Sequence, residues 1–274
     1  LMNTTQSDNA NRRLSARSVA LPAEHGSWSL VSEPILLGML VAPSWAGACL
    51  AVGAFALFLF NRPFKVYWSD RRRGRAYERT ALAKRYALIY GAIGVLGFLI
   101  GFALGGWRPF APLALAVPLL ALFMVYDQRP GRFWQAELAA PVAFASIVAA
   151  MAVANGWDWT HALALWGFMS ARSVPAVLFI RARLRLDKGK PAGAGDSLPG
   201  ALLAHVIALA AVIVLVWPGW LPWTAVAATA LLLGRAAWGL SPWRWRSSVK
   251  ALGFLETGFG ILAVLLVALG YWTQ

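Results

Sequence analysis

Residues 198–217 read LPGALLAHVIALAAVIVLVW and contain no Asp, Glu, Lys or Arg. A helix needs about 20 mostly apolar residues to cross the hydrocarbon core of a bilayer, so this stretch predicts a membrane-spanning helix. Similar stretches recur along the chain, and together they predict an all-α polytopic bundle of about nine transmembrane helices. We expect spans near residues 27–45, 47–61, 85–106, 109–126, 135–154, 159–181, 198–217, 220–239 and 251–272.

The composition of the chain favours the same class of protein. Hydrophobic residues make up 59% of the sequence and charged residues only 13%, which is too apolar for a soluble domain. The apolar stretches occupy the surface that a nucleic acid would need, so the net charge of +14 does not predict a nucleic-acid partner. We expect a disordered cytoplasmic tail over residues 1–19 and a single transmembrane helical domain over residues 20–274.

The basic residues predict the orientation of this multi-pass membrane protein. They concentrate in the N-terminal tail and in every second loop, while the opposite loops hold only Arg108. By the positive-inside rule, the N-terminus lies in the cytoplasm and the C-terminus outside. Tryptophans, which favour the headgroup layer, cluster at the expected outer ends: Trp45, Trp107, Trp157, Trp159, Trp217, Trp220, Trp223 and Trp272.

Two arginines of the sixth expected span indicate an anion site. Arg172 lies near the middle of the span, where a charge costs roughly a few kcal/mol unless it is paired or hydrated. Arg183 follows eleven residues later on the same helix face. Guanidinium groups match phosphate or carboxylate in bidentate fashion, so the two arginines can bind an anion without a metal. The alternative is that Arg172 pairs with Glu33 or Glu256 inside the bundle.

Polar residues also gather at the start of the first expected span. Glu24 and His25 precede this span and Glu33 lies two turns into it. They form either a ligand site or an interfacial arrangement in which His25 donates to a backbone carbonyl. No set of residues has metal-ligand spacing, so we expect no metal site. In the ninth span Glu256 needs a partner, and Arg235 is the nearest candidate in sequence.

Glycines in two spans indicate closely packed helices. Gly97 and Gly101 have a spacing that lets helix backbones approach each other in a membrane. Gly253, Gly258 and Gly260 occur together in the ninth span. We interpret both groups as packing positions and not as phosphate-binding loops.

The two longest expected cytoplasmic loops, 62–84 and 182–197, follow the second and sixth spans. This layout resembles the UbiA superfamily of intramembrane prenyltransferases, which have nine helices and an aspartate-rich loop at each of these places. The resemblance implies that magnesium on the aspartates holds the diphosphate of an isoprenoid substrate, whose tail lies in the helical bundle.

The first of the two motifs departs from the superfamily pattern. Asn61 stands where the superfamily has an asparagine. Arg62, Lys65 and Ser69 occupy the three positions that hold aspartates in the superfamily. The nearest acidic residue is Asp70, one position late. The sign of the charge at this place is therefore reversed.

The second motif departs in the same way. Its aspartate positions fall on Arg172, Phe179 and Arg183, and Asp187 lies one turn further. A transferase with this sequence would use arginines in place of the aspartate-magnesium motifs. Asp70 or Asp187 would then be its base or its residual metal ligand.

A second resemblance rests on two short motifs. The segment before the first span has the pattern Pro-x-Glu-His-Gly-x-Trp, formed by Pro22, Glu24, His25, Gly26 and Trp28. The sixth span contains Arg-Ser-Val-Pro-Ala-Val-Leu over residues 172–178. Both motifs are similar to those of the YwiC-like integral membrane proteins. This resemblance implies a membrane protein without specifying a reaction.

We therefore expect a cavity open to the cytoplasm that binds an anionic amphiphile, either an isoprenoid diphosphate or a phospholipid. The alternatives are a UbiA-like prenyltransferase, in which Asp70 or Asp187 is catalytic and magnesium is the cofactor, and a small-anion transporter. Outside the transferase alternative we expect no cofactor, and the expected partner is a membrane lipid or lipid diphosphate. The expected ligand-binding residues are Glu24, His25, Asn61, Arg62, Lys65, Arg172 and Arg183.

Overall fold

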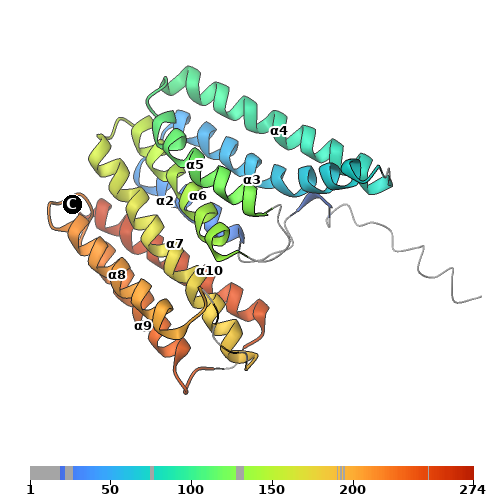
Figure 1. Ribbon diagram of the computed structural model, residues 1–274. Helices are drawn as coiled ribbons and strands as arrows, with labels where there is room; N and C mark the ends of the chain where they lie inside the picture. Colours follow the sequence, from blue (N-terminus) through green and yellow to red (C-terminus); the bar gives the residue numbers. More distant parts are fainter. Residues whose placement is uncertain are drawn as a thin grey trace, which may run out of the picture.

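The computed structural model describes residues 19–21, 27–74, 77–127, 133–189, 191, 193, 195–245 and 247–274. Within these ranges the regular structure is helical and contains no strand, which confirms the all-α prediction (Figure 1). The nine helices are α2 (Ser27–Val41), α3 (Trp45–Arg72), α4 (Glu78–Gly105), α5 (Phe110–Asp127), α6 (Trp134–Ala154), α7 (Trp159–Asp187), α8 (Leu198–Val216), α9 (Thr224–Leu240) and α10 (Val249–Trp272).

The lengths of the helices suit a protein that spans a membrane. Six of the described helices, α3, α4, α6, α7, α8 and α10, are long and apolar enough to cross a bilayer. Helices α2, α5 and α9 are apolar but shorter, and the 15 residues of α2 extend over about 22 Å. Each of the nine expected spans coincides with one helix. The chain is therefore an integral, multi-pass membrane protein.

Two of the expected loops are wrong in extent. Helix α3 continues to Arg72 and α4 begins at Glu78, so most of the expected loop 62–84 is helical. Likewise, α7 continues to Asp187. Apolar composition shows where a helix leaves the hydrocarbon, but not where the helix ends. Arginine and lysine are good helix formers that also favour helix C-termini, so the charged residues after these two spans stay helical. The 28 residues of α3 thus reach about 42 Å, beyond the roughly 30 Å of a hydrocarbon core.

Side-chain caps set the starts of several helices. Ser44 accepts a hydrogen bond from the backbone N–H of Gly47 at 3.0 Å, and α3 begins with the next residue. Ser197 and Ser248 make the same contact, at 3.2 Å each, before α8 and α10. Each serine satisfies one of the backbone donors that a helix start leaves unpaired.

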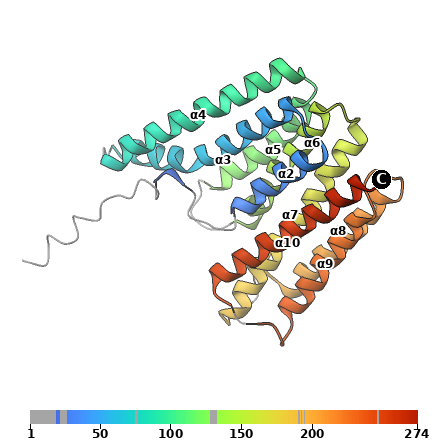
Figure 2. The same ribbon diagram turned by 180° about the vertical axis from the view of Figure 1, so that it is seen from behind.

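Six helices form a closed ring. Helix α2 packs against α6, followed by α7, α8, α9 and α10, and α10 returns to α2. Helix α7 also contacts α9 and α10, so it lies toward the inside of this ring. Helices α3 and α4 form a hairpin that packs on α6 and α2 through α3, and α5 packs on α6. The hairpin lies on one side of the molecule and α8, α9 and α10 on the other (Figures 1 and 2).

Close backbone contact holds the α3–α4 hairpin together. A Cβ atom at Gly97 would lie 2.8 Å from the carbonyl oxygen of Cys49 and 2.8 Å from the backbone nitrogen of Gly53. A Cβ at Gly101 would lie 2.8 Å from the side chain of Leu50. The predicted packing role of Gly97 and Gly101 is thus confirmed, because any side chain at Gly97 would push the two backbones apart.

Candidate functional site

Four charged side chains from four helices meet in the interior of the ring. They are Glu33 of α2, Arg172 of α7, Arg235 of α9 and Glu256 of α10, and all four are buried. Arg172 contacts Glu33 at two places. Its Nε lies 2.8 Å from Oε2, and its Nη2 lies 2.8 Å from Oε1. The Nη2–Oε1 contact is a charge-assisted hydrogen bond, whereas Nε and Oε2 lie at ion-pair distance without hydrogen-bond geometry. Of the two partners that the sequence left open, Glu33 is therefore the one whose carboxylate binds Arg172.

Glu256 also contacts Arg172, through its backbone. Arg172 Nη2 donates to the carbonyl oxygen of Glu256 at 3.1 Å. Gly260 makes room for this arrangement, because a Cβ there would lie 1.8 Å from Glu33 Oε1 and 2.4 Å from Arg172 Nη2. The packing role expected for Gly260 is thus confirmed. For Gly253 and Gly258 it is wrong, since an added Cβ would meet no atom of the described residues within 4 Å.

Arg235 and Glu256 form the second ion pair of the cluster. Arg235 Nη2 lies 3.0 Å from Glu256 Oε2, which confirms the pairing expected from the sequence. The guanidinium carbon lies 4.2 Å from the ring centroid of Phe179 and 5.8 Å from that of Phe259, within range of cation-π attraction. In the described part of the chain, none of the three guanidinium nitrogens of Arg235 has a partner in hydrogen-bond geometry.

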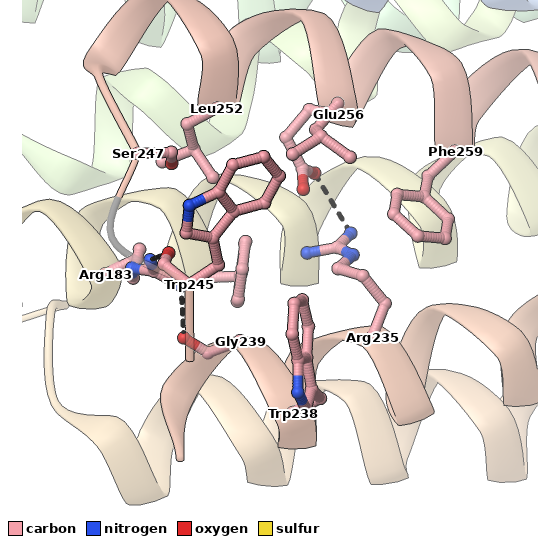
Figure 3. Close-up of a pocket in the computed structure, with 11 residues that line it drawn as sticks. Arg183, Arg235, Trp238, Gly239, Trp245, Ser247, Leu252, Glu256 and Phe259 are labelled. Carbon is pink, nitrogen blue, oxygen red and sulfur yellow. Dashed lines mark hydrogen bonds and ion pairs between the residues drawn. The ribbon is translucent and has the colours of Figure 1, made fainter. Parts of the chain in front are cut away.

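A pocket lies next to this second pair (Figure 3). Its walls come from α7, α9, α10 and the segment that joins α9 to α10. Arg235 and Glu256 reach toward each other at one side of it, and Trp238 and Trp245 lie nearby (Figure 3). The lining residues are Phe179, Arg183, Arg235, Trp238, Gly239, Trp245, Ser247, Leu252, Leu255, Glu256 and Phe259.

Arg183 fixes the wall of the pocket. Its Nη1 donates to the carbonyl oxygen of Gly239 at 2.6 Å, and its Nη2 donates to the carbonyl oxygen of Trp245. Its Nε donates to Asp187 at 2.8 Å. Arg183 is buried and bound on each of its nitrogens, so it holds the α9–α10 segment against α7. Among the predicted site residues that the structure describes, it is the one that lines this pocket.

The other predicted ligand-binding residues lie elsewhere. Asn61 and Arg62 are half-buried and Lys65 is exposed on α3, a helix that packs on α2, α4 and α6 and not on the walls of the pocket. Arg172 does not line the pocket and is paired with Glu33. Glu24 and His25 fall outside the described residues. Ligand binding by these residues stays a prediction.

The two aspartates considered for catalysis are each bound by arginine. Asp70 accepts hydrogen bonds from Arg79 Nε at 3.0 Å and Nη2 at 2.8 Å, and from Thr80 at 2.9 Å. Asp187 accepts from Arg183 at 2.8 Å and from Arg244 at 3.0 Å.

These carboxylates do not fit the magnesium that the UbiA resemblance implies. Magnesium in such a site needs carboxylate oxygens that are free to coordinate it, and the oxygens of Asp70 and Asp187 are held by guanidinium groups. Nor do the described residues contain a group of three His, Cys, Asp or Glu side chains that could hold a metal ion.

One buried histidine lies close to the pocket and was not singled out by the sequence. His205 of α8 is 3% exposed, and its Nδ1 lies 2.8 Å from the carbonyl oxygen of Ala201. Nδ1 must therefore carry a proton, and Nε2 has no partner among the described residues. Its ring meets the edge of Phe179, a residue of the pocket wall. A lone histidine in an apolar span is the only signal that the sequence offers for it.

The fold and the site define a polytopic helical membrane protein with a charge cluster and a partly charged pocket in its interior. Residues 21–152, from α2 through most of α6, match the model of the family described as YwiC-like protein, which confirms the resemblance for this part of the chain. Glu33 lies inside this matched part, and Arg172, Arg235 and Glu256 lie beyond it. Comparisons with curated proteins and with solved structures gave no match.

Proposed function

We propose that this membrane protein binds an anionic amphiphile, an isoprenoid diphosphate or a phospholipid, whose headgroup is held by Arg235 in the pocket. The observation that carries the proposal is the state of the Arg235 guanidinium. The residue is only 8% exposed and lines the pocket, yet its nitrogens have no hydrogen bond within the described residues. Each unsatisfied buried donor costs about 1–3 kcal/mol. Phosphate oxygens would satisfy the planar fork of donors.

The surroundings of the pocket favour a ligand with an apolar tail. Trp238 is 54% and Leu255 44% exposed, and both also line the pocket. In a membrane these exposed apolar side chains face lipid, so the edge of the pocket borders the hydrocarbon. Trp245, which is also exposed, has the amphipathic indole ring that favours the headgroup layer. A headgroup can lie in the pocket while its tail stays among lipid chains.

The size of the pocket adds one requirement. Its volume is about 40 Å³, room for roughly three water molecules and too little for a lipid headgroup. Binding therefore requires a lining side chain to move. Trp245 is the side chain most suited to move, because it is 72% exposed and lies in the segment between α9 and α10.

The position of the pocket along the helices fits a cytoplasmic opening. It lies at the end of the bundle where α7 finishes and α10 begins, and Arg244 and Lys250 are close in sequence to its lining residues Trp245 and Leu252. The positive-inside rule assigns such a basic end to the cytoplasm. The proposed ligand is thus a lipid of the cytoplasmic leaflet.

A titration tests this proposal with matched variants in detergent. Arg235→Lys keeps the positive charge beside Glu256 but removes the bidentate fork. We expect its affinity for geranylgeranyl diphosphate or short-chain phosphatidylglycerol to fall at least about tenfold, equivalent to about 1.4 kcal/mol. Lys84→Gln, which removes an exposed charge from α4, should bind as the unmodified protein does.

Comparison of the ligands shows whether the bound phosphate group belongs to an isoprenoid diphosphate or to a phospholipid. Tighter binding of the prenyl diphosphate than of phosphatidylglycerol would identify the isoprenoid as the ligand, and the reverse order would identify the phospholipid. Pyrophosphate, which lacks a tail, should bind far more weakly than either lipid. Equal affinities of Arg235→Lys and the unmodified protein for all of these ligands would contradict the proposal.

Removal of divalent metal ions gives a second expected result. Because guanidinium groups supply the positive charge, binding of geranylgeranyl diphosphate should persist in excess EDTA. It should weaken as salt rises, since ions screen the attraction between charges. Loss of binding in EDTA and its return with magnesium would instead support the transferase alternative.

A further inference from the structure

The four-charge cluster is electrically neutral and almost dry. Glu33, Arg172, Arg235 and Glu256 are 1%, 3%, 8% and 3% exposed. Two carboxylates balance two guanidiniums, so no charge is left over. Buried ions must be balanced in this way, because an unpaired charge in a dry interior is strongly destabilising.

The two carboxylates are held very differently. Glu33 receives two contacts of 2.8 Å from Arg172 and is not part of the pocket wall. The carboxylate of Glu256 faces the pocket and contacts only Arg235, at 3.0 Å, among the described residues. Neither Glu256 Oε2 nor Glu33 Oε2 makes a hydrogen bond there, but Glu33 Oε1 accepts one from Arg172. An anion that takes the Nη2 group of Arg235 therefore displaces the Glu256 carboxylate from it.

We infer that Glu256 takes up a proton when an anion binds at Arg235, so that the protein binds an anion and a proton together. This inference rests on the proposed anion site. A Glu256 carboxylate displaced from Arg235 would be a buried charge with no partner, and such groups are neutralised by protonation. The proton enters from the aqueous side through the pocket and forms an O–H bond on the displaced carboxylate. The new O–H can donate to the bound anion.

The charge balance supports this step. Before binding, the four side chains sum to zero. An anion of one negative charge and one proton add zero, so the buried cluster stays neutral after both have bound. Without the proton the cluster would carry a net negative charge in a low-dielectric interior, where this is unfavourable.

The other charged and titratable groups around Glu256 do not take up the proton in its place. On α7, Arg172 and Arg183 are positively charged and already bound to acceptors. On α2, Glu33 stays paired with Arg172. His205 of α8 lies behind Phe179 and is not part of the pocket wall.

The experiment measures proton uptake directly. Calorimetric titration of the purified protein with short-chain phosphatidylglycerol, in buffers of different ionisation enthalpy, gives the number of protons taken up. We expect about one proton per lipid, and an affinity that falls about tenfold per pH unit at the alkaline end of roughly pH 5.5–8.5. The phosphodiester keeps its charge throughout this range, so the lipid itself does not contribute.

Three variants test whether Glu256 is the residue that takes up the proton. Glu256→Gln is a permanently neutral substitute for the protonated side chain, so it should bind the lipid with no proton uptake and no pH dependence. Glu78→Gln, an exposed change on α4, should keep both, and so should His205→Gln. Uptake of a proton that persists in Glu256→Gln, or binding without proton uptake in the unmodified protein, would overturn the inference. Absence of lipid binding at every pH would instead reject the proposed anion site.

Discussion

Replacement of Arg172 by glutamine is expected to lower the free energy of unfolding by about 3–5 kcal/mol. The change leaves the Glu33 carboxylate, which is 1% exposed, without its charged partner in the interior of the ring. The measurement is a denaturant titration of the purified protein in detergent. The double variant Arg172→Gln/Glu33→Gln should recover most of the loss, because two neutral amides can hydrogen-bond to each other.

The control for Arg172 lies on the same helix. Arg181 contacts Glu137 at 2.5 Å, but these side chains are 19% and 33% exposed. Arg181 Nε also donates to the carbonyl oxygen of Gly195 at 3.2 Å, so its exchange for glutamine should lower the free energy of unfolding by about 1–2 kcal/mol, less than the change at Arg172. If Arg172→Gln were as stable as the unmodified protein and lost only ligand binding, Arg172 would be a ligand residue and not a structural one.

Gly260→Ala should have an effect of similar size through a different cause. The added Cβ would lie 1.8 Å from Glu33 Oε1 and 2.3 Å from its Cδ, so the Arg172–Glu33 pair could not keep its geometry. We expect a loss of about 3–5 kcal/mol, since a buried ion pair is broken and a tightly packed site is overfilled.

Gly258 provides the matched control for Gly260. It lies on the same helix, and an added Cβ there would meet no atom of the described residues within 4 Å. Gly258→Ala should therefore leave the free energy of unfolding unchanged or raise it by up to about 1 kcal/mol, because alanine favours a helix more than glycine does. Thermal unfolding of the two variants side by side makes the comparison, and equal midpoints would contradict the close approach at Gly260.

The sequence predicted the helices well because the membrane imposes a simple rule. A span must be apolar over a minimum length, and this leaves a clear signal in the six long helices and an apolar stretch in α2, α5 and α9. The rule says nothing about a helix beyond the hydrocarbon, which is why the extension of α3 to Arg72 was missed. Charged residues end the apolar signal without ending the helix.

The site could be predicted only in part. The energetic argument that a charge within a span needs a partner singled out Arg172, and it also paired Arg235 with Glu256. It could not choose between Glu33 and Glu256 for Arg172, because that choice depends on how α2, α7 and α10 are packed. The pocket beside Arg235 was missed for the same reason, since its walls come from three helices and a connecting segment.

The central claim is that Arg235 holds the headgroup of an anionic lipid, and mass spectrometry of lipids that copurify with the protein tests it most directly. The unmodified protein and Arg235→Lys would be purified in the same mild detergent and their bound lipids extracted and quantified. We expect the unmodified protein to retain about one phosphate-bearing amphiphile, and Arg235→Lys to retain at least about tenfold less of that species. An identical lipid complement in both proteins would contradict the claim.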